Sequence, residues 1–256
     1  MSQTFSLAQM GWTAFFQQQL TLDDLENYQL GRVSSVHRAH IEVMTEHLTQ
    51  GSPNHSLPVM SGMSDITVGD WILFDEQGHY HQTLERLSLF SRKSAGSKIG
   101  LQMIAANVNT VFVVCSLNNN FNLSRIERYL ALANEAGVTP VVVLTKADCC
   151  DDPLEFTQQV QALDPMLMVE TVNALDPASV KPLEYWCTSG KTVAFMGSSG
   201  VGKSTLVNTL LGNTLQEGRI QSTGASREQD SRGRHTTTSR SLHLMPSGSL
   251  LLDTPG

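Results

Sequence analysis

The sequence predicts an α/β protein in two parts, a small β-rich barrel followed by a mostly parallel sheet with helices on both faces. Two observations lead to this prediction. Residues 28–98 contain short β-rich stretches separated by turn residues, with no room for a long helix. From about residue 108, strands of branched apolar residues alternate with helical segments, which is typical of a buried parallel sheet.

Composition narrows the class of protein. The 256 residues are 40% apolar and 16% charged, which suits one large or two modest domains and excludes wholesale disorder. No apolar run approaches the ~20 residues of a membrane span, and the N-terminus lacks the basic start of a signal peptide. We therefore expect a soluble, cytoplasmic protein without a membrane partner. We also expect it to be a monomer.

Charge and cysteine content exclude further classes. The net charge of 17 − 24 = −7 argues against a protein that coats nucleic acid non-specifically. None of the four cysteines forms a CxxC pair or a zinc-ligand cluster with histidine, so reduced thiols and no zinc site are expected. These cysteines are Cys115, Cys149, Cys150 and Cys187.

The first part begins with a predicted helical extension over residues 1–27, in which Asp23 and Asp24 are interpreted as closing a helix. Residues 28–98 form the predicted barrel, with strands at 31–36, 41–44, 71–74 and 80–84, and a linker at 94–98. Its aromatic residues Trp71, Phe74 and Phe90 could stack on RNA bases, but a small barrel also needs an aromatic core. We predict core positions for them.

Six histidines crowd this first part of the chain. Their spacing predicts surface or turn positions, because no group of them has carboxylate or cysteine partners that would make a convincing metal site. They are His37, His40, His47, His55, His79 and His81.

The second part, residues 99–256, contains the alternating elements. The predicted strands cover residues 110–116, 141–145, 166–171, 192–196, 242–245 and 250–252. The predicted helices cover residues 124–136, 154–163 and 203–211.

A phosphate-binding motif, G-x-x-x-x-G-K-[ST], lies between one of these strands and the helix that follows it. Its glycines let backbone N–H groups surround phosphate oxygens, its lysine bridges the β and γ phosphates, and its serine hydroxyl ligates Mg²⁺. The motif predicts a site for a nucleoside triphosphate. The predicted phosphate-binding residues are Gly197, Ser198, Ser199, Gly200, Val201, Gly202, Lys203, Ser204 and Thr205.

Base selection is assigned to Thr145, Lys146, Ala147 and Asp148, at the end of a predicted parallel strand. The Asp148 carboxylate can accept from guanine N1–H and N2–H₂ together, whereas adenine offers no such donor pair. A buried Asp148 would therefore favour guanine by about a hundredfold or more, with the stem of Lys146 lying over the base. The alternative is a polar strand end capped by Asp148.

Two further segments complete the predicted site. Asp253-Thr254-Pro255-Gly256 has the D-x-x-G pattern, in which the aspartate holds Mg²⁺ through water and the Gly256 N–H senses the γ-phosphate. The threonines at 236–238 could supply the hydroxyl that completes Mg²⁺ coordination, and we assign it to Thr236; an ordinary strand entry is the alternative. His235 is a candidate for orienting water, with a flexible-loop histidine as the alternative.

The order of these motifs is informative. In the common arrangement of a GTPase the phosphate loop comes first and the base-selecting motif last, but here residues 145–148 precede residues 197–204. The sequence therefore predicts a circularly permuted P-loop GTPase domain.

Between Arg219 and Arg240 the sequence carries five arginines against two acidic residues, a local charge of +3. This segment is either a solvated loop or a basic contact surface.

Taken together, the chain resembles the ribosome-small-subunit-dependent GTPase A family (RsgA, also called YjeQ) over nearly its whole length. The likeness rests on LAQMGWTAFF near the N-terminus, LFSRK at 89–93, TKAD, GSSGVGKST, GRHTTT and DTPG. The resemblance implies an N-terminal OB-fold, GTP hydrolysis stimulated by the 30S ribosomal subunit and its rRNA, and a late role in small-subunit maturation.

The chain departs from the family pattern in three places. Thr145 replaces an asparagine, and Asn173-Ala174-Leu175 replaces Ser-Ala-Leu, although the Ala174 N–H can still meet guanine O6. The family also continues past D-x-x-G into a C-terminal zinc-binding domain, so we expect a truncated chain that ends at Gly256 and lacks that zinc site.

The leading prediction is a GTPase that binds GTP, GDP and Mg²⁺, with Lys203, Ser204, Thr236 and His235 as its catalytic residues. A non-catalytic RNA-binding module with a nucleotide-binding domain, and a P-loop ATPase, are the alternatives.

Overall fold

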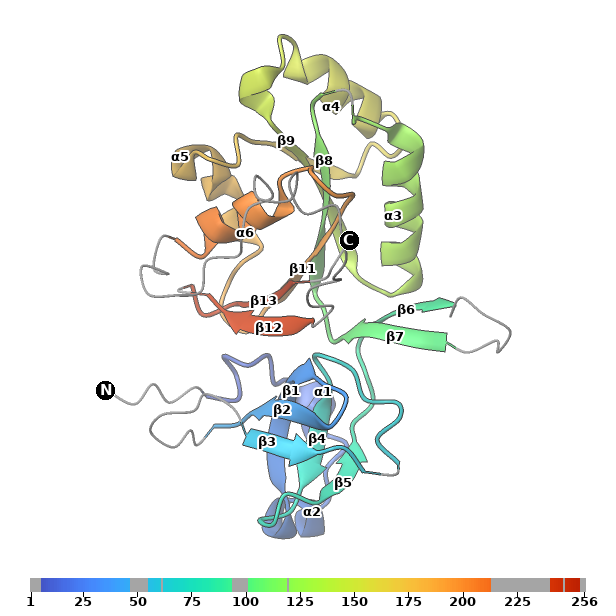
Figure 1. Cartoon of the computed structure of the whole chain (residues 1–256), viewed down its shortest axis with the longest axis vertical. Helices are drawn as coiled ribbons and strands as arrows, with labels where there is room; N and C mark the ends of the chain where they lie inside the picture. Colours follow the sequence, from blue (N-terminus) through green and yellow to red (C-terminus); the bar gives the residue numbers. More distant parts are fainter. Residues whose placement is uncertain are drawn as a thin grey trace, which may run out of the picture.

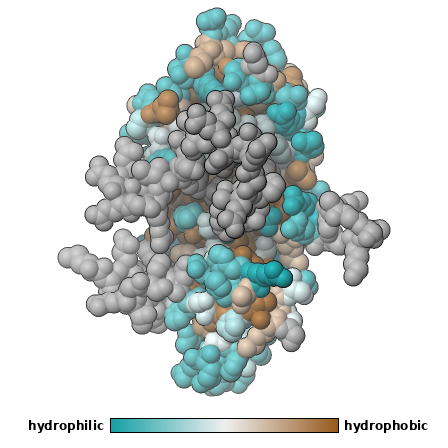
Figure 2. All heavy atoms as spheres, viewed as in Figure 1, coloured by the Kyte–Doolittle hydropathy of each residue, from teal (hydrophilic) through white to brown (hydrophobic). Residues whose placement is uncertain are grey.

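The computed structural model describes residues 6–46, 55–60, 62–93, 101–118, 120–212, 240–245 and 247–253. A β-rich part lies at one end of the molecule and a helix-covered sheet at the other (Figure 1). In the view of Figure 2 both ends are predominantly hydrophilic, as expected where the apolar side chains of each part face inward. The described residues include no helix with the length and hydropathy that a membrane crossing requires.

The described residues of the β-rich part form five antiparallel strands in the order β3-β2-β1-β4-β5. They are β1 (Gln29–Val36), β2 (His40–Met44), β3 (His55–Pro58), β4 (Trp71–Phe74) and β5 (Tyr80–Thr83). The four predicted strands are confirmed, with ends that shift by one or two residues. Strand β3 was not predicted, because it has only four residues, Leu57 is its single buried side chain, and it ends at a proline, a residue that is depleted in strands.

The aromatic residues of this part are core residues, as predicted. Trp71, Phe74 and Phe90 are all buried. Trp71 packs edge-on against Trp12, with ring centroids 4.8 Å apart, and Phe16 packs beside both. The N-terminal segment is therefore held to the strands by an aromatic cluster.

Within residues 6–28, two short helices, α1 (Ala14–Gln17) and α2 (Leu22–Asn27), precede the strands. The prediction that Asp23 and Asp24 close a helix is wrong, because both lie in the first turn of α2. Thr21 caps this helix: its hydroxyl accepts from the Asp24 N–H at 3.1 Å, and the Asp24 carboxylate accepts from the Thr21 N–H at 2.9 Å. Acidic side chains favour this end because the helix dipole is positive there.

The second part is built on a sheet with the strand order β10-β9-β8-β11-β13-β12, parallel except for β12. Its strands are β8 (Thr110–Ser116), β9 (Thr139–Thr145), β10 (Met168–Thr171), β11 (Thr192–Met196), β12 (Ser241–Leu244) and β13 (Leu250–Asp253). Its helices are α3 (Leu123–Glu135), α4 (Pro153–Gln161), α5 (Pro177–Val180) and α6 (Lys203–Leu210), with 3₁₀ turns at Ala147–Cys149 and Lys181–Tyr185. The strands and helices predicted for this part are confirmed to within a few residues.

Alternate side chains of the strands enter two separate cores, one on each face of the sheet. Val111 and Val113 of β8 join the core under α3 and α4, whereas Phe112 and Val114 join the core under α5 and α6. This period of two is what a strand buried on both faces requires. Figure 1 shows α3 and α6 on opposite sides of the sheet.

A two-stranded hairpin, β6 (Leu89–Lys93) paired with β7 (Leu101–Ala106), lies where the two parts meet (Figure 1). The predicted boundary between residues 98 and 99 falls between these paired strands. The predicted linker, residues 94–98, lies outside the described residues.

The two parts are also joined by main-chain pairing. Ser35 of β1 pairs with Ser241 of β12, and Ser241 in turn pairs with Asp253 at the end of β13. The β-rich strands are therefore continuous with the sheet that carries the predicted nucleotide site.

A buried arginine reinforces this junction. Arg32 is 1% exposed and donates to three carbonyl oxygens, those of Met10 at 2.5 Å, Gly69 at 3.3 Å and Asn107 at 2.9 Å. Burial lowers its pKa to about 9, so it stays protonated at neutral pH. One charged side chain thus links three segments that are distant in sequence.

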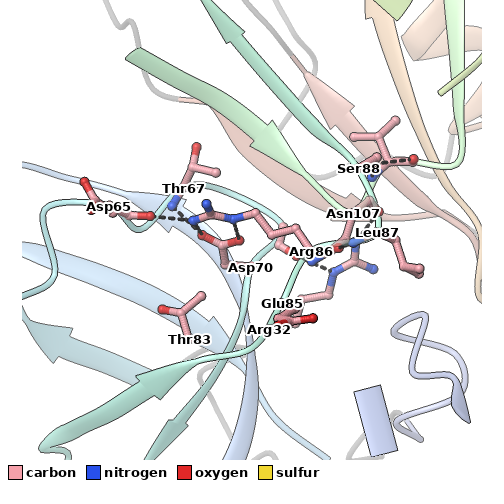
Figure 3. Close-up of polar contacts among 12 residues, drawn as sticks. Arg32, Asp65, Thr67, Asp70, Thr83, Glu85, Arg86, Leu87, Ser88 and Asn107 are labelled. Atoms are coloured by element: carbon pink, nitrogen blue, oxygen red, sulfur yellow. Dashed lines mark hydrogen bonds and ion pairs between the residues drawn. The ribbon is translucent and has the colours of Figure 1, made fainter. Parts of the chain in front are cut away.

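A second buried ionic group lies beside it (Figure 3). The Asp70 carboxylate is fully buried and accepts from Arg86 Nε at 2.6 Å, Arg86 Nη2 at 2.8 Å and the Thr67 N–H at 2.8 Å. Arg86 also donates to the Asp65 carbonyl oxygen at 2.5 Å. Such a paired, hydrogen-bonded carboxylate is tolerated in a core because each oxygen has a donor.

Candidate nucleotide-binding site

The phosphate-binding motif folds as a loop between β11 and α6, as predicted. Gly200 and Gly202 have φ angles of 79° and 96°, a left-handed region that residues with a Cβ rarely adopt. Gly197 lies so close to the Val114 carbonyl oxygen of β8 that a Cβ there would collide with it. The glycines therefore allow this loop to form directly against the neighbouring strand.

Lys203 and Ser204 open helix α6, immediately after this loop. The Lys203 ammonium donates to the carbonyl oxygens of Gly197 at 2.5 Å and Ser198 at 2.9 Å, so it lies across the mouth of the loop. Ser199 and Gly200 are exposed on the same loop. The positive charge and the N-terminus of an eight-residue helix are thus directed at one place, where an anion would be stabilised.

Thr145 connects the segment predicted to select the base, residues 145–148, to the phosphate loop. It is fully buried at the end of β9, and its hydroxyl donates to the Val201 carbonyl oxygen at 2.5 Å. A hydroxyl has one proton to donate, and here it is used to fix the two motifs to each other.

The residues after Thr145 turn sharply outward. Lys146 has φ 60° and ψ 38°, a left-handed conformation that is uncommon for a non-glycine residue. Asp148 is exposed, so the burial assumed in the argument for guanine selectivity is not supplied by the chain itself. The neighbouring Cys149 thiol donates to the Asp148 carboxylate at 3.4 Å, and this hydrogen bond raises the pKa of Cys149.

The loop after β10 lies beside this segment. The Asn173 side-chain oxygen accepts from the Leu175 N–H at 3.0 Å, which closes an Asx turn. The Ala174 carbonyl oxygen accepts from the Thr209 hydroxyl of α6 at 2.6 Å, and the Ala147 N–H donates to the Val172 carbonyl oxygen at 3.3 Å. Residues 145–148, 173–174 and 197–205 therefore meet at the carboxyl-terminal edge of the sheet.

The residues predicted to bind Mg²⁺ are described only in part. Strand β13 runs parallel to β11 with Leu252 opposite Ala194, so the backbone of Asp253 reaches the edge from which the phosphate loop starts. Its side chain, together with His235, Thr236 and Gly256, lies outside the described residues, as does the basic segment up to residue 239. A serine hydroxyl and a carboxylate are oxygen ligands that suit Mg²⁺, so Ser204 and Asp253 fit this ion.

Among the described residues of the site, sequence reasoning missed one. Arg125, in the first turn of α3, donates through Nη1 to the Ser198 hydroxyl of the phosphate loop at 3.0 Å. Nothing in the sequence around Arg125 distinguishes it from a surface arginine. Its partner Ser198 is 73 positions away, so only the fold brings the two side chains together. It adds a second positive charge beside the loop that Lys203 already covers.

The fold and this site define a P-loop nucleotide-binding protein of the circularly permuted GTPase class. Strand order, parallel direction, the loop before α6 and the position of residues 145–148 at the end of β9 all agree with that class. A model of the RsgA GTPase family matches residues 83–256. The chain belongs to the RsgA GTPase family.

Relatives and solved structures agree with this assignment. The chain is 59% identical over 254 residues to small ribosomal subunit biogenesis GTPase RsgA 2 of Vibrio parahaemolyticus, covering 98% of this chain and 67% of that protein. It is 46% identical over 252 residues to RsgA of Mesorhizobium japonicum, covering 98% and 71%. Its fold is similar to that of YjeQ from Thermotoga maritima, with a TM-score of 0.63 and 22% identity over 90% of this chain and 75% of that one.

A second solved structure, that of the circularly permuted GTPase YloQ, gives a TM-score of 0.57 at 19% identity and covers 90% of this chain and 71% of that one. These structural likenesses support the predicted fold class, including the permutation of the GTPase domain.

Proposed function

We propose that this protein binds GTP with Mg²⁺, hydrolyses it to GDP and phosphate, and acts on the small ribosomal subunit during its biogenesis. The main support is the hydrogen bond from the Thr145 hydroxyl to the Val201 carbonyl oxygen, which holds the TKAD segment (residues 145–148) and the phosphate loop together in one site. Relatives that are 46–59% identical are named as small ribosomal subunit biogenesis GTPases, which supports the ribosomal role. The same name favours a GTPase over an ATPase or a non-catalytic module.

In this proposal the phosphate groups are held by the loop at 197–202 and by Lys203. On binding, the ammonium would exchange its two carbonyl partners for β- and γ-phosphate oxygens, which are stronger acceptors because they are charged. Mg²⁺, when bound with the nucleotide, would neutralise phosphate charge. Ser204, Thr236 and the Asp253 carboxylate are its proposed ligands, the last through water, and the Gly256 N–H is the proposed γ-phosphate sensor.

The base is proposed to lie between the Lys146 stem and the loop of Asn173 and Ala174. There the exposed Asp148 carboxylate accepts from guanine N1–H and N2–H₂, and the base itself excludes water from it. The Cys149 thiol, a weak donor, is readily displaced. Hydrolysis then depends on positioning and electrostatic stabilisation, with His235 as the candidate that orients the attacking water.

The proposed partner is the 30S subunit with its rRNA. We also propose that the protein is a monomer and that it binds this partner in the cytoplasm. The arginines between 219 and 240 supply the local positive charge in an otherwise acidic chain, which suits contact with RNA phosphates. We propose the same division as in the sequence prediction: an extension at 1–27, an OB-fold at 28–98 and a permuted GTPase domain at 99–256.

Multiple-turnover phosphate release, with and without 30S subunits, tests this function. We expect turnover of GTP but not ATP, a rise with 30S subunits, and a loss of about a hundredfold or more in Lys203→Ala. Lys191→Ala is the matched control, because Lys191 is exposed and lies outside the site. Equal turnover of ATP and GTP, or of the two lysine variants, would contradict the proposal.

A further inference from the structure

The hairpin between β1 and β2 brings three metal-ligating side chains together. One nitrogen of His37, one nitrogen of His40 and one carboxylate oxygen of Glu42 all lie within 4.8 Å of one another. All three residues are half-buried. The two imidazole rings are nearly parallel, with centroids 4.5 Å apart and an interplanar angle of 25°.

The backbone explains why these three residues converge. Two residues separate His37 from His40, and the His37 N–H donates to the His40 carbonyl oxygen at 2.9 Å, which closes the turn. His40 and Glu42 are two residues apart on β2, so their side chains leave the same face of the strand. The sequence prediction that these histidines lack a carboxylate partner is therefore wrong, because strand geometry supplies Glu42.

Two serines on β1 support this arrangement. The Ser35 hydroxyl and His37 Nε2 are 3.0 Å apart, and the Ser34 hydroxyl donates to the Glu42 carbonyl oxygen at 3.1 Å. When Nε2–H donates to Ser35, the His37 lone pair is left on Nδ1. Metal-ligating histidines commonly have such a partner on the other ring nitrogen, which fixes the tautomer and the ring orientation.

The donor set indicates the class of ion. Two imidazoles and one carboxylate suit borderline divalent transition metals such as Zn²⁺, which accept three protein ligands and complete their coordination with water. Mg²⁺ prefers oxygen ligands, so this set differs in kind from the nucleotide site. We propose that His37, His40 and Glu42 form a binding site for a divalent transition-metal ion of the zinc class.

Two other histidine–carboxylate contacts provide an internal comparison. His79 Nδ1 lies 2.9 Å from Asp75 Oδ2, and His81 Nε2 lies 3.7 Å from Asp24 Oδ1. In the part of the chain that the structure describes, neither pair belongs to a group of three such residues. They should bind an ion far more weakly than the β1–β2 hairpin.

The position of the site gives the ion a structural consequence. Ser35 adjoins the hairpin on β1 and pairs with Ser241 of the GTPase sheet. A bound ion would cross-link the residue that follows β1, His37, to strand β2 at the turn. It would so restrain β1, the strand through which the β-rich part is joined to that sheet. Binding only to the folded state also raises stability by mass action.

The test is a metal titration of the tag-free, EDTA-treated full chain in excess Mg²⁺. We expect one equivalent of Zn²⁺ to bind by calorimetry, Co²⁺ to give the visible absorption of a low-coordinate site, and Zn²⁺ to raise the melting temperature. His40→Asn and Glu42→Gln should each weaken binding by about tenfold or more and abolish the thermal shift. His79→Asn is the matched control and should leave both unchanged.

The adjacent Cys149 and Cys150 are another group in the chain that could bind such ions. The double variant Cys149→Ser/Cys150→Ser should therefore bind Zn²⁺ like the parent protein. Circular dichroism of His40→Asn and Glu42→Gln checks that both variants fold. The proposal is overturned if no saturable binding is found, if both hairpin variants bind normally, or if binding is lost only with the cysteines.

Discussion

Removal of the Arg86 charge directly perturbs the buried ion pair of the β-rich part, which Arg86 forms with Asp70. Arg86→Met keeps an apolar stem but leaves the buried Asp70 carboxylate without the two donors at 2.6 and 2.8 Å. Removing one partner of a buried ion pair costs about 3–5 kcal/mol. Because 20% of the Arg86 side chain is accessible to water, we expect the lower end, about 3 kcal/mol, or roughly 6–12 °C in melting temperature.

The pH dependence of this loss has a definite sign. Burial raises the pKa of Asp70 above 3.8, and hydrogen bonds from Arg86 oppose that rise. In Arg86→Met the contribution of Arg86 is lost, while the Thr67 N–H and the Arg32 charge remain, so the folded-state pKa of Asp70 rises further above the unfolded value. The folded protein then binds a proton more tightly than the unfolded chain, and the deficit shrinks as pH falls through the folded-state pKa.

Urea unfolding followed by tryptophan fluorescence, at neutral pH and at about pH 5, measures both effects. Arg92→Met is the matched control, since Arg92 is exposed and its side chain donates to the Gln102 side-chain oxygen at 2.9 Å rather than to a buried carboxylate. It should change the free energy of unfolding by no more than about 0.5 kcal/mol. Adding Asp70→Asn to Arg86→Met should restore part of the loss at neutral pH.

Two outcomes would refute this reasoning. One is an Arg86→Met protein as stable as Arg92→Met at neutral pH. The other is a deficit that grows on acidification, because an uncompensated carboxylate must be relieved by protonation.

Three further predictions concern the proposed function. Asp148→Asn should weaken GDP and GTP binding and improve binding of xanthosine nucleotides, whose base reverses the donor pattern at position 2; equal GDP affinity by fluorescence titration would remove TKAD from base selection. Ser204→Ala should shift the Mg²⁺ dependence of GTP binding to higher concentration, and an unchanged Mg²⁺ titration would contradict its assignment as ligand. Neutralising Arg227, Arg232 and Arg234 should lower 30S affinity without changing GDP affinity, and should reduce the log–log salt slope by about one unit for each RNA phosphate that the protein no longer neutralises.

Much of this protein follows from local sequence. The phosphate loop at 197–204 and the strands of the second part could be assigned because their signals span a few consecutive residues: a glycine-lysine spacing, or a run such as Val111–Cys115 that must be buried on both faces. The order of the motifs along the chain then established the permutation. Trp71 could likewise be assigned to the core, because a small barrel has few other residues large enough to fill it.

Other features depend on which segments meet in space. Strand β3 and the hairpin β6–β7 have weak local signals, and pairing with neighbours stabilises them. Asp23 and Asp24 were assigned to the wrong end of a helix, because acidic residues suit a helix start but the chain alone did not show where α2 begins.

The polar contacts that complete the site and the junction were decided by the tertiary structure alone. Arg125 reaches Ser198 across 73 positions, and Arg32 reaches Asn107 across 75. His37, His40 and Glu42 lie close in sequence, yet it is the fold of the turn between β1 and β2 that brings one ligand atom of each within 4.8 Å of the others. A side chain's partners are set by the packing of the whole chain, whereas a motif's identity is set by its own few residues.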